Sequence, residues 1–357
     1  MQSSISMARS ACAADMMFAD DLDHPLAHGG GLAAARRLFA DAPEPFLDLS
    51  TGINPYSYPL PQLPPDLFTR LPDPDALAAI AGVAAESYAA PSGAHVVPAP
   101  GTQILLPLVA SLVAPGPAAV VTPTYREHAR AAALAGHRVS EIANLEAARD
   151  ALLVIVSNPN NPDGRLFGKR ELIAVAKRLA RRGGLLIVDE AFMDVGPSDA
   201  SLAGEVGRHA IAVLRSFGKF FGLAGVRLGF ALAAPQLAMR LAAKLGPWPV
   251  SGPALAIGAT ALADSSWIEE TRKRLIATAD RLKTILSAAG LEIVGGTTLY
   301  QLARMPAATD LFHHLGRAGI LVRNFPEQPS WLRFGLPATE AAWARLQIAM
   351  AAYADTH

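Results

Sequence analysis

Short apolar runs alternate with longer stretches of helical periodicity between about residues 76 and 250. The runs are apolar at every position, which is typical of strands that are covered on both faces of a sheet. Among the longer stretches, Lys169–Arg182 begins with charged residues and is followed by two glycines, a common helix end. This alternation predicts a mostly parallel sheet with helices on both faces. The predicted strands are Ala119–Thr122, Leu152–Ser157, Leu185–Asp189, Ala210–Arg215 and Leu228–Leu232.

The pattern changes on both sides of this region. Residues 43–75 contain nine prolines, and such a density excludes regular helix and central strand. We therefore expect an ordered arm that lies across another surface. After residue 262, a long amphipathic helix over Ser266–Ala289 is expected to lead into a smaller α+β domain. Its other predicted elements are short strands near Leu299–Arg304, Ile320–Arg323 and Trp331–Gly335 and a last helix, Thr339–Tyr353.

These changes predict four parts of the chain. They are a flexible N-terminal extension (1–23), an arm that also acts as a lid (24–75), a large domain (76–262) and a small C-terminal domain (263–357). The extension does not resemble a signal peptide, because Asp15 interrupts its apolar stretch. The predicted fold class is α/β, with a mostly parallel central sheet in the large domain and an α+β small domain.

Composition excludes several classes of protein. The chain has 31 basic and 31 acidic residues, so its net charge of zero gives no electrostatic reason to bind nucleic acid or an anionic membrane. No apolar run reaches the ~20 residues that a membrane-spanning helix needs. Cys12 is the single cysteine, which excludes an internal disulfide and a cysteine cluster for zinc or iron–sulfur. We expect a cytoplasmic protein without a metal centre.

A lysine follows the predicted strand Ala210–Arg215, in the run Ser216-Phe217-Gly218-Lys219. Burial lowers the pKa of a lysine because it disfavours the ammonium form, and a neutral amine is what a Schiff base with a carbonyl cofactor requires. Eight residues further on, Arg227 lies among glycines and offers a planar fork for a phosphate. The pair Ser216 and Lys219 alone is a weak signal, whereas the whole run from Ser216 to Gly229 is a strong one.

Two other predicted strands also end in polar side chains. Asp189 closes one of them, where it could cap the next turn or pair with a protonated pyridine nitrogen. The run from Ser157 to Gly164 contains two Asn-Pro steps. It could be a turn, or it could hold the Asn161 amide as a donor to a cofactor phenolate oxygen. Because chemistry collects at the carboxyl ends of parallel strands, the functional alternatives predict one shared site.

Two more segments complete the candidate site. Gly101-Thr102-Gln103 precedes a predicted helix over Ile104–Val113, whose start is either a plain N-cap or a phosphate site made of backbone N–H groups. Tyr125 follows the strand Ala119–Thr122, so its ring could stack on a planar cofactor or fill the core.

In this order, the five segments resemble the fold type I enzymes that depend on pyridoxal 5′-phosphate (PLP), the aminotransferase class I/II superfamily. The resemblance covers roughly residues 25–355. It implies that Lys219 forms the Schiff base with PLP, that Asp189 pairs with its pyridine nitrogen and that Tyr125 stacks on its ring. Asn161 then bonds the phenolate oxygen, and Arg333 grips the α-carboxylate of the substrate. The implied ligands of the cofactor phosphate are Gly101, Thr102, Gln103, Ser216 and Arg227.

Within this superfamily, three segments resemble the threonine-phosphate decarboxylases of cobalamin biosynthesis: His28-Gly29-Gly30, the run from Asp48 to Pro55, and Leu71–Pro74. The related histidinol-phosphate aminotransferases usually carry Asn-Glu-Asn-Pro in place of Gly52-Ile53-Asn54-Pro55, and they lack the leading His-Gly-Gly. They also commonly have a tyrosine at the position of Phe192. The implied reaction is decarboxylation of O-phospho-L-threonine to (R)-1-aminopropan-2-yl phosphate; the alternative is transamination of histidinol phosphate or a related amino acid.

The resemblance also implies a set of substrate contacts. His28 is either part of a phosphate-binding lid or a flexible hinge, and Arg323 is either a second phosphate ligand or a surface ion pair. Which of His28, Arg323 and Arg333 meets phosphate and which meets carboxylate stays open. Tyr56, or Tyr58 in its place, is expected to reach the partner subunit's cofactor phosphate, since the family forms homodimers with shared sites. The full set of implied substrate ligands is His28, Gly29, Asn54, Asn161, Arg323 and Arg333.

Overall fold

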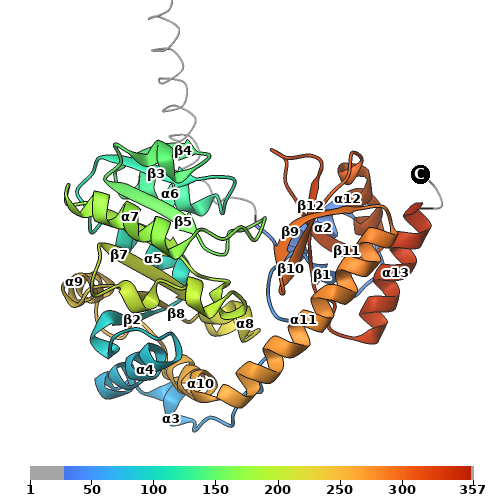
Figure 1. The fold of residues 1–357 in the computed structure, drawn as a ribbon. Helices are drawn as coiled ribbons and strands as arrows, with labels where there is room; N and C mark the ends of the chain where they lie inside the picture. The colour runs from blue at the N-terminus through green and yellow to red at the C-terminus, as the bar shows by residue number, and fades with distance from the viewer. Residues whose placement is uncertain (1–27, 355–357) are drawn as a thin grey trace, which may run out of the picture.

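The structure is a computed structural model, which describes residues 28–354. The predicted extension over residues 1–23, with Cys12, lies outside these residues. Two sheets and their helices form two lobes, which the long helix α11 (Ser265–Ala288) joins along one side (Figure 1). The domain boundaries at residues 75 and 262 stay a proposal. The parts that contain the seven-stranded and the five-stranded sheet are called here the large lobe and the small lobe.

The sheet of the large lobe has the strand order β2-β8-β7-β6-β5-β3-β4. Strands β3 to β7 run parallel to one another, whereas β8 is antiparallel to both of its neighbours. The predicted α/β class with a mostly parallel central sheet is thereby confirmed. The strands are β2 (Val96–Ala99), β3 (Pro117–Val121), β4 (Arg138–Ile142), β5 (Leu153–Ser157), β6 (Leu185–Asp189), β7 (Ile211–Ser216) and β8 (Gly229–Leu232).

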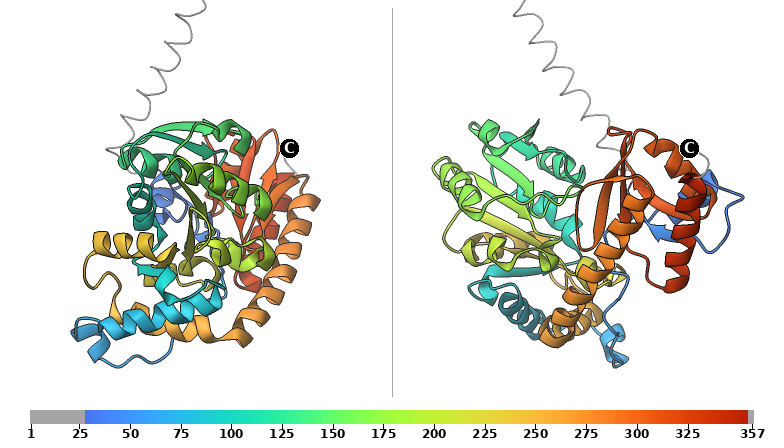
Figure 2. Two further views of the ribbon diagram at one scale, coloured as in Figure 1. Left: turned by 60° about the vertical axis from the view of Figure 1, so that its left-hand side comes forward. Right: turned by 45° about the vertical axis from the view of Figure 1, so that its right-hand side comes forward.

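Helices cover both faces of this sheet (Figure 2). In β5, Val154 and Val156 pack into the core on one face, and Leu153 and Ile155 pack into the core on the other. Every residue of β5 is therefore buried, which explains why the strand is apolar throughout. The first face is covered by α4 (Pro74–Ser87), α7 (Lys169–Ala180) and α10 (Gly252–Ala263), and the second by α5 (Thr102–Ala110), α6 (Glu127–Leu134) and α9 (Pro235–Leu245).

Both edge strands of the large sheet escape the sequence analysis. Strand β4 pairs with β3 alone, and its outer positions are exposed, so its polar residues break the apolar pattern of a buried strand. Strand β2 contains Pro98, which an edge strand tolerates because one side of the strand needs no hydrogen bonds. An apolar run therefore detects the central strands and misses the edges.

The sheet of the small lobe has the order β1-β11-β12-β10-β9. Its predicted strands are confirmed near the expected places, while β9 is missed because two glycines, Gly295 and Gly296, interrupt it. No helix within residues 28–354 is long and apolar enough to cross a membrane. The elements are β9 (Glu292–Thr297), β10 (Tyr300–Arg304), β11 (Ile320–Asn324), β12 (Trp331–Gly335), α12 (Ala308–Arg317) and α13 (Glu340–Ala354).

The arm contains more regular structure than its prolines suggest. The expectation of no regular helix is wrong for the single turn α3 (Asp66–Thr69), whereas β1 (Leu47–Leu49) is an edge strand and agrees with the exclusion of a central strand. Pro65 directly precedes α3 and Pro74 is the first residue of α4, positions where a helix needs no N–H donor. Strand β1 pairs in parallel with β11 at the edge of the small sheet. Ahead of it, α2 spans Leu32–Leu38.

Candidate active site

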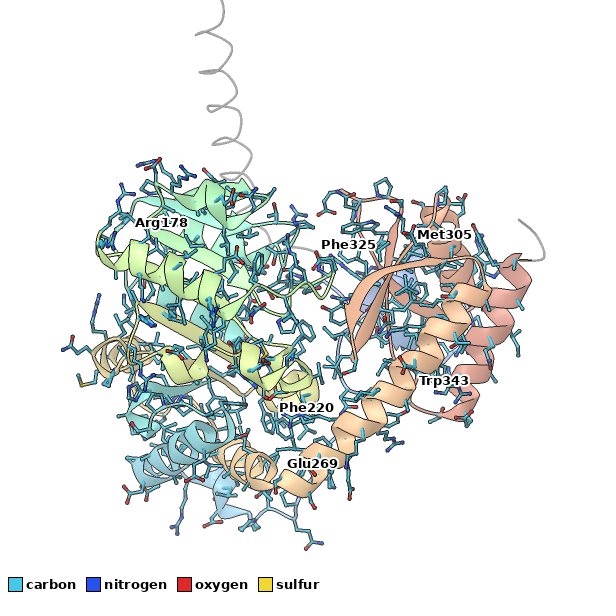
Figure 3. All side chains as sticks on the ribbon, in the orientation of Figure 1. Arg178, Phe220, Glu269, Met305, Phe325 and Trp343 are labelled. Carbon is cyan, nitrogen blue, oxygen red and sulfur yellow. The ribbon has the colours of Figure 1, made fainter. Side chains whose placement is uncertain are left out.

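A cavity of about 1140 Å³ lies where the two lobes face each other. Its floor comes from the carboxyl ends of strands β3, β5, β6 and β7, where a parallel sheet leaves its strand-to-helix loops open. The small lobe closes the other side with Arg323, Phe325 and Arg333. Figure 3 shows Phe325 on the side of the small lobe that faces the large lobe.

Lys219 lies in the cavity wall on the single turn α8 (Phe217–Phe220), directly after β7. Burial lowers the pKa of its ammonium group to about 8, with further lowering from Arg333 and Arg227 and an opposing effect of Asp189. The backbone N–H of Asn54 donates to the Lys219 carbonyl at 2.9 Å and fixes the turn. The position thus provides an amine that loses its proton far more easily than an exposed lysine.

Asp189 is the last residue of β6 and is 6% exposed. Its Oδ1 accepts a hydrogen bond from the Ala191 backbone N–H at 3.1 Å, and its Oδ2 lies 2.9 Å from Nε2 of His128. His128 is fully buried, and the sequence analysis misses it. The available signal was its place three residues after Tyr125, just beyond the end of a predicted strand, where the site residues of a parallel sheet gather. Because a carboxylate only accepts, His128 must donate from Nε2.

Asn161 and Arg333 meet across the lobes. Nη1 of Arg333 donates to Asn161 Oδ1 at 2.5 Å, and Nη2 donates to the Ser50 carbonyl at 2.8 Å. Since Oδ1 is engaged, the Asn161 amide presents its Nδ2 donor to other partners. Burial lowers the pKa of Arg333 to about 10. Its Nε is buried with no hydrogen-bond partner among the described residues, so the Nε–H group remains available to an anion.

The residues predicted to hold a phosphate lie close together at the start of α5 and are called here the phosphate cup: Gly101, Thr102, Gln103, Ser216 and Arg227. Helix α5 begins at Thr102 rather than at Ile104 as predicted, and Gly101 before it supplies no side-chain cap, so the first N–H groups point outward. Gly101 has φ +91°, and a Cβ there would lie 2.7 Å from Nη2 of Arg227. A Cβ on Gly229 would likewise lie 2.8 Å from the Thr102 nitrogen. The glycines thus let Arg227 and the helix start approach one point; Gly101, Thr102, Gln103, Ser216 and Arg227 all line the cavity.

Tyr125 also lines the cavity, just after β3. Its hydroxyl donates to Gln103 Oε1 at 3.1 Å, and burial raises the pKa of the phenol. The contact holds the ring against the start of α5. A flat ring fixed beside the cup and near Asp189 is a surface on which a planar cofactor can stack.

His28, Gly29 and Arg323 reach the same cavity from the arm and the small lobe. Nε2 of His28 lies 2.9 Å from Oε1 of Glu127. A Cβ on Gly29 would lie 2.4 Å from the Ser50 carbonyl oxygen, so the segment packs closely on the backbone beside it. The sequence predicted His28 and Gly29 in the site but missed Glu127.

The structure does not bring Asn54, Tyr56 or Tyr58 to the cavity wall. Asn54 is buried; its Nδ2 donates to the Phe220 carbonyl at 2.7 Å and its Oδ1 accepts from the Tyr56 N–H at 2.8 Å. Its amide therefore holds the turn of Lys219, and its role as a direct substrate ligand stays a prediction. The Tyr56 hydroxyl lies 3.4 Å from Oγ1 of Thr278, and its predicted contact with a partner subunit stays a prediction.

These residues fit PLP. A lysine with a lowered pKa, a carboxylate at a strand end, a phosphate cup made from glycines, a helix start and an arginine, and a fixed aromatic ring all line one cavity. These four features match, in the same order, the aldehyde, the pyridine nitrogen, the phosphate and the aromatic ring of PLP. Within residues 28–354, no three His, Cys, Asp or Glu side chains gather as a metal site.

Comparison with known proteins agrees with this site. Residues 69–346 match the family model "Aminotransferase class I and II", and the chain belongs to this family of PLP-dependent enzymes. The threonine-phosphate decarboxylases of Pseudomonas aeruginosa and of Sinorhizobium sp. are 44% and 43% identical to it over 333 and 335 residues, which is 92% of this chain and 98% of each relative. A solved histidinol-phosphate aminotransferase from Sinorhizobium meliloti, in complex with PLP, has the same fold, with a TM-score of 0.78 at 21% identity over 94% of this chain and 97% of that one.

Proposed function

We propose that this protein is a PLP-dependent decarboxylase that converts O-phospho-L-threonine to (R)-1-aminopropan-2-yl phosphate and CO₂ in cobalamin biosynthesis. The observation that carries the proposal is the His28-Gly29 segment, which lines the same cavity as Arg323. This segment adds a second anion-binding region to the cavity, apart from the cup around Arg227. Identity of 43–44% with two threonine-phosphate decarboxylases over nearly their whole length supports the same assignment.

In this proposal the cofactor is held by Lys219, Asp189, Asn161, Tyr125 and the phosphate cup. When bound, PLP would withdraw electrons from the α-carbon of the substrate and so weaken the bonds at that carbon. The protein therefore contributes by orienting the substrate, which decides which bond at the α-carbon breaks. Asp189, held by His128, supplies the negative charge for the pyridine nitrogen, and Asn161 directs its Nδ2 donor to the phenolate oxygen.

The proposed substrate, O-phospho-L-threonine, carries an α-carboxylate at one end and a phosphate at the other. Arg333 retains an unpartnered Nε donor for one anionic group, while His28 and Arg323 form the other anion site at the cavity mouth. Gripping the phosphate fixes the substrate's rotation about its α-carbon, so binding energy from a remote group sets the geometry of the reacting bond. Lys219, with a pKa of about 8, returns a proton to the α-carbon after CO₂ leaves.

The alternative, a histidinol-phosphate-type aminotransferase, is opposed by the packing around Gly52. A Cβ at this position would lie 2.8 Å from Cδ1 of Tyr300 and 2.9 Å from Cε1 of Phe192. The asparagine usual in those aminotransferases therefore cannot be accommodated here without moving two buried rings. Phe192 also has no hydroxyl to offer the phenolate oxygen.

We further propose a homodimer with shared active sites. Four large apolar side chains are exposed on the arm and just before α10: Leu60, Phe68, Leu71 and Trp248 are 63%, 66%, 67% and 53% exposed. Segments α3, α4 and α10 lie together at one end of the large lobe (Figure 1). An apolar surface of this kind is typical of a subunit interface.

The test uses the purified protein with PLP and O-phospho-L-threonine, and it follows CO₂ release and the amine product by mass. A parallel reaction contains histidinol phosphate and 2-oxoglutarate and is assayed for glutamate. The proposal expects CO₂ and aminopropanol phosphate without glutamate. Glutamate without CO₂ would establish the aminotransferase instead.

A further inference from the structure

Four side chains form a continuous hydrogen-bonded chain along the cavity wall. The Tyr125 hydroxyl donates to Gln103 Oε1 at 3.1 Å, and Gln103 Nε2 donates to Glu127 Oε2 at 2.8 Å. The other Glu127 oxygen lies 2.9 Å from Nε2 of His28. The chain therefore joins the ring beside the cofactor cup to the histidine at the cavity mouth.

Glu127 is the centre of this chain. It lies in the first turn of α6 and is only 4% exposed. An ionised carboxylate accepts hydrogen bonds and cannot donate, so it fixes the polarity of both neighbours: Gln103 must direct its amide N–H toward it, and His28 must present an N–H at Nε2. Nη1 of Arg130 lies 3.5 Å from Oε2 of Glu127 and adds a cation beside it. With these donors in place, the buried charge of Glu127 is compensated within the protein.

We propose that Glu127 is a positioning residue that acts through His28, holding the imidazole over the cavity so that its other nitrogen meets the phosphate of the substrate. The inference rests on the proposed function, because it takes the phosphate of O-phospho-L-threonine as the group that His28 binds. The contact engages Nε2 and leaves Nδ1 on the opposite side of the ring. A histidine that donates from both nitrogens is a cation, and the carboxylate at Nε2 balances its charge.

His28 needs such a tether. Its side chain is 39% exposed, and the three residues after it are glycines, which have no side chains to pack against the imidazole. The next anchor along the chain is the Gly30 N–H, which donates to Ser50 Oγ at 2.7 Å. Glu127 thus removes, before the substrate binds, the rotational freedom that an exposed imidazole would otherwise lose on binding.

The experiment measures kcat and KM of the PLP-loaded enzyme for O-phospho-L-threonine. Glu127→Ala is expected to raise KM about tenfold or more, in line with loss of a charge-assisted hydrogen bond, and also to lower kcat, because the phosphate contact orients the reacting bond. Glu127→Gln retains an acceptor without the charge and is expected to give an intermediate KM. The matched control is Glu171→Gln, which removes an exposed carboxylate from the first turn of α7 and should leave both constants unchanged.

A double-mutant cycle with His28 separates positioning from a general structural effect. If Glu127 acts through His28, the double variant His28→Ala/Glu127→Ala has the same KM as His28→Ala alone. Hydrogen exchange of the peptide that contains Gly29 and Gly30 gives a readout without activity, and it is expected to be faster in Glu127→Ala than in the wild type.

An additive rise in KM in the double variant, an unchanged KM in Glu127→Ala, or unchanged exchange would each overturn the inference. A wild-type protein that releases no CO₂ would refute the proposed function alone. In that case the exchange experiment still decides whether Glu127 orders His28.

Discussion

Replacing Gly52 by alanine tests whether the wall between the arm, Phe192 and Tyr300 is as closely packed as the structure shows. The added Cβ would lie 2.8 Å from Tyr300 Cδ1 and 2.9 Å from Phe192 Cε1. Carbon atoms in contact are normally about 3.5–4.0 Å apart, so these approaches are too close by roughly 0.6 Å or more. The backbone of Gly52 is outside the left-handed region, so the penalty is purely steric.

The two rings have little room to yield. Tyr300 is 0% and Phe192 4% exposed, their ring centroids are 5.0 Å apart, and the Tyr300 hydroxyl donates to the Asn160 carbonyl at 2.8 Å. Overpacking of this kind costs about 1–3 kcal/mol of folding stability. Because the rings border Lys219 and the Asn160-Asn161 loop, we expect Gly52→Ala also to lower kcat about tenfold or more by displacing these groups.

The assay is urea denaturation of the apoprotein together with steady-state CO₂ release by the loaded enzyme. Gly82→Ala is the matched control, since a Cβ at Gly82 in the helix α4 meets nothing within 4 Å and alanine favours a helix by about 0.5–1 kcal/mol. In the double variant Gly52→Ala/Phe192→Ala the added Cβ has room, so the loss of stability should be smaller than the sum of the losses in the two single variants. A Gly52→Ala variant as stable and as active as the wild type would refute the steric reasoning.

Three further outcomes are expected. The rate at which the apoprotein takes up PLP should rise with pH through about 8, because the neutral amine of Lys219 reacts and its pKa is lowered to about 8; a rise centred near 10.5 would contradict the burial of this lysine. Gly101→Ala should weaken PLP binding about tenfold or more in an equilibrium titration, since its φ is +91° and its Cβ would lie 2.7 Å from Nη2 of Arg227; unchanged affinity would show that the cup adapts. His128→Phe should lower the urea stability of the apoprotein by about 1.5–3 kcal/mol, because it leaves a buried carboxylate oxygen without its donor; equal stability would mean that water replaces the imidazole.

The sequence by itself determined the architecture of the large lobe and the location of its chemistry. Strands buried on both faces must be apolar at every position, so β5, β6 and β7 are evident as continuous runs. The polar residues that end these runs, among them Asp189 and Lys219, then have to gather at one edge of a parallel sheet. That consequence follows from local pattern and strand direction, and it needs no long-range contacts.

Only the tertiary structure decided how distant segments complete the site. Asn54 holds the turn of Lys219 because its amide Nδ2 donates to a backbone carbonyl 166 residues away. His128 and Glu127, adjacent on α6, became partners of Asp189 and His28, which lie 61 residues after and 99 residues before them respectively. A side chain's role depends on which donors and acceptors the fold brings within about 3 Å of it. Short-range sequence patterns carry no record of such pairings.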